Sequence, residues 1–243
     1  MTDNYTPNKI SIQIPTRSRS HHMINVINNL IDKVSDLNNI EILLRMDNDD
    51  SHSIEIIKNT FPEHINSLIK IFVGNRGGGY YDLPKFHYEL SEISTGEWIF
   101  LYNDDVIMDT ENFDLLIIEH HNKKIILQSI GENGNSHGGV IGGNWFFPII
   151  HRDIVKNLGH YSIDTPYADG WIRVIGEKLN LHKIIPINLQ HLSEIRNFMD
   201  DINIDKTHIN NTSGLSFNWS YHINDPNGLI YKDVEKLKLI YGQ

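Results

Sequence analysis

Short apolar runs alternate with stretches of helical periodicity along the first half of the chain. The run 9–15 (KISIQIP) is rich in β-branched residues and ends in proline, as a short strand does. Residues 21–34 repeat apolar positions at the spacing of an amphipathic helix. The strands predicted next are 40–46, 68–74 and 98–102, and the helices predicted between them are 53–61 and 85–94. This alternation predicts an α/β fold with a mostly parallel sheet and helices on both of its faces.

The second half of the chain has a looser pattern. The segment 113–121 fits a helix or a strand equally well, and 131–144 is a glycine-rich loop. The strands predicted here are 124–130, 145–150 and 183–189, and the predicted helices are 151–159, 169–180 and 232–241. Gly159 is expected to end its helix, and Ser51 or Ser53 to cap the helix at 53–61. Without repeats or a linker, we expect a single domain.

Composition narrows the function classes. The chain has 243 residues, 40% of them hydrophobic, which suffices for one substantial core. Its formal net charge of −10 leaves no broad basic face, so we expect no nucleic-acid partner. Without cysteine, disulfides and thiolate metal sites are excluded, and a metal would need oxygen or imidazole ligands. Neither a signal peptide nor a membrane span is predicted, so we expect a cytoplasmic protein.

Polar clusters follow each of the first four predicted strands. They are TRSRS at 16–20, DNDDS at 47–51, NRGGG at 75–79 and NDD at 103–105. In an open parallel sheet the carboxyl ends of neighbouring strands meet at one edge, where ligands bind. Arginines, acidic residues and glycines gathered at that edge predict a site for a phosphorylated ligand.

The NDD cluster suggests a metal. If the strand continues, Asn103 and Asp105 point to one side and Asp104 to the other, so one carboxylate can hold a divalent ion while its neighbour takes a ribose hydroxyl. Oxygen ligands favour Mg²⁺ or Mn²⁺, and such an ion bridging a diphosphate would neutralise a nucleotide leaving group. The alternative is an ordinary solvated turn, because Asn and Asp are common turn residues.

Four motifs in this order resemble a GT-A glycosyltransferase of the family 2 type. They are ISIQIPTRSR, LLRMDNDDS, GNRGGG and TGEWIFLYNDDVI. The resemblance covers 9–108 well and the remainder more loosely. It implies a Rossmann-like GT-A domain spanning 1–243, with a mostly parallel central sheet and a smaller antiparallel portion on the acceptor side. On this reading 9–108 binds the nucleotide sugar, and 109–243 binds the acceptor and ends in a helix.

The resemblance also implies roles for residues of the nucleotide half. Pro15 and Arg17 would flank the base, and Arg19 would face the phosphates or the base loop. Either Asp47 or Asp49 would receive the base imide or the ribose, and Arg76 lies where a base contact is common. The alternative for the arginines is surface salt bridging, and for the acidic residues at 47–50 a helix-capping turn.

At the NDD motif itself, the resemblance assigns Asp104 to the ribose and Asp105 to the metal. Asn103 stands at the first motif position, where the family has Asp, so metal affinity is expected to be weaker or more dependent on substrate. His191, just beyond a predicted strand, matches a histidine that completes the metal site in many relatives. The alternative for His191 is an ordinary surface or core histidine.

For the acceptor half, the segment YADGWIR at 167–173 resembles the family's acidic motif at a helix start. Asp169 is therefore the candidate base that takes the proton of the acceptor hydroxyl, although Ala168 replaces the family's Glu. The alternatives are that Asp169 only caps the helix or that Asp164 is the base. The residues implied to approach donor sugar and acceptor are Gly143, Asn144 and Trp145. Trp145 fits a core position equally well.

These features together predict an enzyme: a metal-dependent glycosyltransferase that moves a sugar from a nucleoside-diphosphate sugar, expected to be a UDP-sugar, to a glycan or other hydroxyl acceptor with inversion. A sugar-phosphate nucleotidyltransferase is the alternative within the same fold, but the loop after the first strand lacks the required glycines. A carbohydrate-binding or scaffolding protein with a degenerate GT-A site is the alternative from another class, suggested by Asn103 and Ala168.

Overall fold

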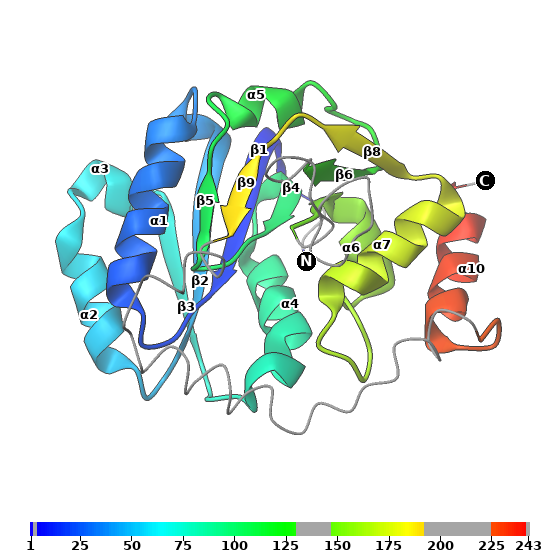
Figure 1. Cartoon of the computed structure of the whole chain (residues 1–243), viewed down its shortest axis with the longest axis horizontal. Coiled ribbons are helices and arrows are strands. Elements are labelled where there is room, and N and C mark those ends of the chain that lie inside the picture. Colours follow the sequence, from blue (N-terminus) through cyan, green and yellow to red (C-terminus); the bar gives the residue numbers. More distant parts are fainter. Residues whose placement is uncertain (2–3, 130–146, 192–224, 242–243) are drawn as a thin grey trace.

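The computed structural model describes residues 1, 4–129, 147–191 and 225–241. These residues form a seven-stranded sheet in the order β3-β2-β1-β4-β7-β6-β8 and a separate two-stranded sheet, β5-β9 (Figure 1). The strands are β1 (Thr6–Pro15), β2 (Ile40–Asp47), β3 (Ile69–Gly74), β4 (Gly96–Leu101), β5 (Val106–Met108), β6 (Ile126–Ser129), β7 (Ile149–His151), β8 (His182–Ile185) and β9 (Leu189–His191). The helices are α1 (Ser20–Lys33), α2 (Ser51–Thr60), α3 (Glu63–Asn66), α4 (Leu83–Ile93), α5 (Phe113–Ile118), α6 (Arg152–Leu158), α7 (Ala168–Leu179) and α10 (Leu229–Tyr241). This arrangement confirms the predicted α/β fold.

Strands β1 to β4 are parallel to one another, and their ends follow one another in small steps. Pro15 of β1 lies opposite Arg45 of β2, and Asp47 of β2 lies opposite Gly74 of β3. On the other side of β1, Gln13 lies opposite Leu101, the last residue of β4. The register therefore brings the loops that follow these four strands to one edge of the sheet.

The two faces of the sheet bury two different sets of side chains, because successive residues of a strand point in opposite directions. Ile10, Ile12 and Phe100 face α1 and α5, together with other apolar residues of β2 and β4. The alternate residues Ile99 and Leu101 face α6, α7 and α10 instead. The sheet thus has a separate hydrophobic core on each face.

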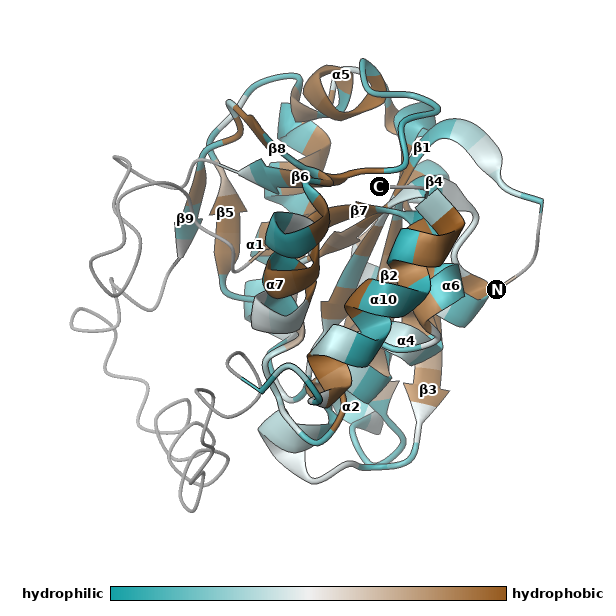
Figure 2. Cartoon of the chain, turned by 90° about the vertical axis from the view of Figure 1, so that its right-hand side faces the viewer, coloured by the Kyte–Doolittle hydropathy of each residue, from teal (hydrophilic) through white to brown (hydrophobic). Residues whose placement is uncertain are grey.

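The helices cover both faces, as predicted from the sequence. Helices α1 and α2 lie on one side of the sheet, and α4, α6, α7 and α10 on the other (Figure 1). Figure 2 shows hydrophobic strands inside and helices that carry both hydrophilic and hydrophobic residues around them. The ambiguous segment 113–121 contains the helix α5, and Gly159 ends α6 at φ 82°, in the left-handed region that glycine enters readily. No helix in the described ranges is long and apolar enough to cross a membrane.

Two details of the predicted elements were wrong. The strand predicted at 183–189 is divided: β8 belongs to the main sheet, whereas β9 pairs antiparallel with β5. Pro186 stands between them, where its ring removes a backbone donor and ends the ladder of β8. The residue at the N-cap of α2 is Asp50, not Ser51 or Ser53, and its side chain accepts a hydrogen bond from the backbone N–H of Ser18 at 2.6 Å.

Candidate functional site

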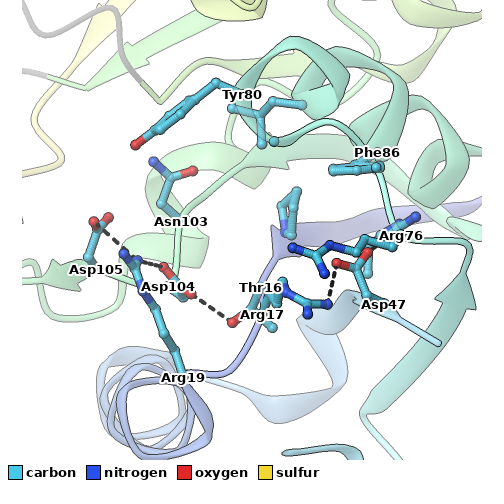
Figure 3. Close-up of a pocket in the computed structure, with 15 residues that line it drawn as sticks. Thr16, Arg17, Arg19, Asp47, Arg76, Tyr80, Phe86, Asn103, Asp104 and Asp105 are labelled. Carbon is cyan, nitrogen blue, oxygen red and sulfur yellow. Dashed lines mark hydrogen bonds and ion pairs between the residues drawn. The ribbon is translucent and has the colours of Figure 1, made fainter. Parts of the chain in front are cut away.

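A cavity of about 270 Å³ opens at the carboxyl edge of β1 to β4 (Figure 3). Its walls come from all four strand ends and from the beginning of α4. The lining residues are Pro15, Thr16, Arg17, Arg19, Arg45, Asp47, Arg76, Gly77, Gly79, Tyr80, Leu83, Phe86, Asn103, Asp104 and Asp105. The expected convergence of four polar clusters at one edge is therefore present.

Most of the residues assigned to the donor from the sequence lie in this cavity. The lining contains Pro15, Arg17, Arg19, Asp47, Arg76, Asn103 and Asp104, and it also contains Asp105, which was assigned to the metal. Asp49 is outside the lining but forms ion pairs with two residues of the wall. Their roles stay predictions, because proximity alone does not show which ligand atom each one contacts.

Arg17 joins the loops after β1 and β2. Its guanidinium donates to Asp47 at 2.9 Å and to Asp49, with Nη2 3.1 Å from Asp49 Oδ2. Arg76, from the loop after β3, lies 3.5 Å from the same Asp49 carboxylate. The bond to Asp49 is the main cause that raises the pKa of Arg17, and the pKa of Asp49 is lowered by the same contact. Both groups are therefore charged at neutral pH.

Arg45 is a site residue that the sequence analysis did not name. Its side chain is only 3% exposed, although it carries a full charge. It donates to the Asp47 carboxylate, to Glu89 at 3.1 Å and to the backbone oxygen of Asn75. Its guanidinium carbon lies 3.9 Å from the centre of the Phe86 ring, within cation–π range. Through these contacts Arg45 links β2 to the loop after β3 and to α4 at the cavity.

Steric limits explain why glycines follow β3. A Cβ atom on Gly77 would lie 2.3 Å from the Phe86 ring and 2.7 Å from Asp82 Oδ2, closer than side chains tolerate. Gly79 has φ 82°, in the left-handed region that glycine enters at little cost. The glycines allow the chain to turn tightly between β3 and α4, so that Tyr80 and Phe86 reach the cavity (Figure 3).

Asp104 is, with Asp47, one of the two most enclosed carboxylates of the site. It accepts hydrogen bonds from the Thr16 hydroxyl at 2.7 Å and from Arg19 Nη1 at 2.8 Å. Burial raises the pKa of Asp104, although the positive charge of Arg19 acts in the opposite direction. Thr16, the residue after β1, thus links the first strand end to the fourth.

The alternation expected for the NDD cluster was wrong. Strand β4 ends at Leu101, two residues before the cluster, and Asp104 and Asp105 lie in a turn. Without a strand the side chains do not alternate, and Asn103, Asp104 and Asp105 all line the same cavity. The turn therefore brings both carboxylates to one side, which a continued strand would have prevented.

The donor set fits a divalent ion only in part. Among the described residues, no three His, Cys, Asp or Glu side chains are grouped as a metal site requires. Asp104 and Asp105 offer hard carboxylate oxygens, the ligands that Mg²⁺ and Mn²⁺ prefer. In the backbone, His191 of β9 lies opposite Val106, the residue that follows Asp105. An ion held by these carboxylates would need further oxygen ligands from a bound diphosphate.

Asp169 lies in the first turn of α7, after the N-cap residue Tyr167. Helix α7 begins on the side of the sheet to which the ends of β1 and β2 point (Figure 1), but Asp169 is not in the lining of the cavity. Burial raises the pKa of Asp169 to about 6, while hydrogen bonds from the backbone of Gly170 and of Asp169 itself lower it. The alternative base, Asp164, is exposed and has φ 57°. Asp169 is thus close to the protonation range of a general base at neutral pH.

The predicted acceptor residues Gly143, Asn144 and Trp145 lie outside the described residues, as does the side chain of His191. The sequence analysis also missed Thr16, Arg45, Tyr80, Leu83 and Phe86 of the cavity wall. A signal was present for Arg45, because a charged residue inside the apolar run IEILLRM must find a partner when the strand is buried. For the aromatic residues the sequence carries no such signal.

The fold is shared with solved glycosyltransferase structures. The mannosyltransferase PcManGT from Pyrobaculum calidifontis, in complex with GDP-Man and Mn²⁺, matches with a TM-score of 0.55 and 11% identity over 75% of this chain and 55% of that one. S. aureus TarS 1–349 in complex with UDP matches with a TM-score of 0.55 and 15% identity, over 74% of this chain and 60% of that one. GalNAc-T7 with UDP, GalNAc and Mn²⁺ matches with a TM-score of 0.55 and 14% identity, over 78% of this chain and 44% of that one.

These similarities establish the predicted GT-A fold. At 11 to 15% identity they extend to the fold alone, and the chain spans only 44 to 60% of the lengths of these three structures. No protein-family model and no curated protein sequence matches the chain. The activity therefore has to be argued from the site.

Proposed function

We propose that this protein is a metal-dependent glycosyltransferase that transfers a sugar from a nucleoside-diphosphate sugar, with a UDP-sugar as the expected donor, to a hydroxyl acceptor with inversion. The observation that carries the proposal is the single cavity where Arg17, Arg76 and the Asp104–Asp105 turn meet. The Arg19 guanidinium in the same cavity suits the diphosphate, and the carboxylates suit the ion that accompanies it. The neighbours solved with GDP-Man, UDP and Mn²⁺ support the same ligand class.

In the proposed reaction, Arg17 and Arg76 contact the base of the nucleotide, and Arg19 faces its diphosphate. Asp104, held by Thr16, is positioned to accept a hydrogen bond from a ribose hydroxyl at the cavity wall. A bound divalent ion would supply positive charge beside the departing diphosphate, and Asp105 is the residue that would hold it, with His191 as the second predicted ligand. The walls formed by Tyr80, Leu83 and Phe86 exclude water from one side of the nucleotide.

Asp169 serves as the base in this proposal. Its carboxylate takes the proton of the acceptor hydroxyl while the oxygen of that hydroxyl bonds to the sugar carbon. The bond from this carbon to the diphosphate oxygen breaks, and its electron pair leaves with the nucleotide. Attack from the face opposite the leaving group inverts the configuration at the sugar carbon.

The first test is calorimetric titration with UDP and GDP in the presence of Mn²⁺. Saturable binding of one nucleotide is expected, and Asp105→Asn should weaken it at least about 100-fold, the upper end of what loss of even an outer-shell metal partner costs. Asp109→Asn is the matched control, because Asp109 is the next acidic residue along the chain and is exposed outside the cavity wall. Failure of both nucleotides to bind at millimolar concentration would refute the proposal.

A second measurement separates a transferase from a binding protein. A transferase slowly hydrolyses its nucleotide sugar when no acceptor is present, so free nucleotide should accumulate with the correct donor. A carbohydrate-binding protein with the same cavity would release none. Release of nucleotide from a panel of UDP- and GDP-sugars therefore also identifies the donor.

A further inference from the structure

Arg19 lies beside both carboxylates of the NDD cluster. It stands at the N-cap of α1, and its Nη1 is 2.8 Å from Asp104 Oδ1 and 3.8 Å from Asp105 Oδ2. Figure 3 shows its guanidinium between these two residues, with a dashed line to each. The side chains of Arg19, Asp104 and Asp105 are 18%, 8% and 13% exposed, so water screens this contact only partly. The three groups form one largely buried charge cluster.

The other arginines of the cavity are engaged elsewhere. Arg17 pairs with Asp47 at the end of β2, and Arg76 pairs with Asp49 in the loop after it. Arg45 pairs with Asp47 and Glu89. Burial lowers the pKa of Arg19, but the charges of Asp104 and Asp105 outweigh it and raise the pKa, so the guanidinium stays charged. Arg19 is thus the cation that the fold places beside Asp105, which is assigned to the metal, and Asp104, which is assigned to the ribose.

A guanidinium and a divalent ion at the same carboxylates exclude each other. Two positive groups about 4 Å apart repel by roughly 1 to 4 kcal/mol per pair of unit charges at effective dielectric constants between those of water and a protein surface. Displacing Arg19 without a new partner would also leave its charge partly buried and unpaired. A diphosphate entering the cavity removes this second cost, because its oxygens give the guanidinium an alternative anionic partner.

We propose that the Arg19 guanidinium neutralises Asp104 and Asp105 in the nucleotide-free protein and keeps a divalent ion out of the site until a nucleoside diphosphate is bound. The inference rests on the proposed function and extends it to the order of binding. Mn²⁺ alone then binds weakly, whereas Mn²⁺ and the nucleotide each strengthen the binding of the other. Arg19 therefore determines how strongly metal binding depends on the nucleotide.

The test measures Mn²⁺ binding to the nucleotide-free protein by the electron paramagnetic resonance signal of unbound Mn²⁺. Arg19→Met should bind Mn²⁺ at least about tenfold more tightly than wild type, since one repulsive charge is removed. Lys33→Met is the charge-matched control, because Lys33 lies at the other end of α1 and pairs with Glu111. It should leave Mn²⁺ affinity unchanged. Arg19→Gln, which retains an N–H donor for Asp104, should show the same gain if the Met variant folds poorly.

Three results would overturn the inference. The first is unchanged Mn²⁺ affinity in both Arg19 variants, and the second is an equal gain in Lys33→Met, which would indicate a general charge effect. The third is a gain that persists when Asp105→Asn is added to Arg19→Met, because the ion would then bind elsewhere. No nucleotide is present in this titration, so its outcome is independent of the nucleotide titration that tests the proposed function.

Discussion

The two halves of the chain position their polar residues in different ways. In 9–108 four parallel strands end at the same edge of the sheet, and a polar cluster lies at or close after the end of each. In 109–243 strand β7 runs antiparallel to β4 and β6, and Asp169 is carried by a helix instead of a strand end. Parallel topology makes the first group of residues converge automatically, whereas the position of the second depends on how α7 packs. Variants of each half can test this contrast.

The largest effect is expected from Asp169→Asn in the acceptor half. If Asp169 is the general base, the variant should transfer sugar about 10²- to 10⁴-fold more slowly while binding the donor nucleotide normally. Because the base must be ionised and burial raises its pKa to about 6, the wild-type rate should fall as the pH drops through that value. Initial rates from pH 5 to 8 measure both effects.

Asp164→Asn is the control for this experiment, since Asp164 is exposed in the loop before α7. Normal transfer by Asp169→Asn would contradict the assignment. A loss in Asp164→Asn instead would move the base to that loop.

The second-largest effect is expected in the donor half, on the stability of the protein. Arg45→Met should lower the free energy of unfolding by about 3 to 5 kcal/mol, because it leaves Asp47 without its nearest buried cation. Chemical denaturation measures this change. Lys85→Met is the control: Lys85 lies 3.9 Å from Glu89, a partner that it shares with Arg45, but its side chain is 68% exposed.

The control should change stability by no more than about 1 kcal/mol, as exposed ion pairs do. Similar losses of unfolding free energy in both variants would mean that Arg45 does not hold the strand ends together. The polar residues of the donor half would then be held in place by the loops after the strands and not by Arg45.

The smallest effect is expected from Asp49→Asn. Asp49 contacts Arg17 and Arg76 at the exposed rim and does not line the cavity. Loss of such exposed pairs should alter nucleotide affinity by at most about fivefold, and less at high salt. Isothermal titration at two salt concentrations measures it, with Asp47→Asn as the buried counterpart. A larger loss in Asp49→Asn than in Asp47→Asn would assign the base or ribose contact to Asp49.

The order of strands and helices in the first half could be predicted because hydrophobic periodicity is strong there and the connections are short. The division at Pro186 was missed, since an apolar run does not show which of two sheets each part of it joins. The direction of Asp104 was also wrong, because the sequence does not mark Leu101 as the end of β4. Both errors concern where a strand ends, which depends on the pairing partner more than on local composition.

Within the site, charged residues at strand ends could be predicted and their partners could not. Arg19 was expected at the phosphates or the base loop, whereas its contact with Asp104 links residues 85 positions apart in the sequence. Phe86 and Tyr80 enter the cavity only because the glycine loop bends the chain between β3 and α4. Such contacts arise from tertiary packing and have no local signature.

The pairing of β5 with β9 limits how this region can vary in length. Strand β5 follows Asp105 directly, and the backbone N–H groups of Asp109 and Asn188 bond across to Asn188 and Thr110 respectively. Removal or insertion of one residue between β8 and β9 would shift β9 by one position and turn its side chains to the opposite face. Homologous chains that share this site should therefore keep the spacer 186–188 at constant length, even where neighbouring segments gain or lose residues.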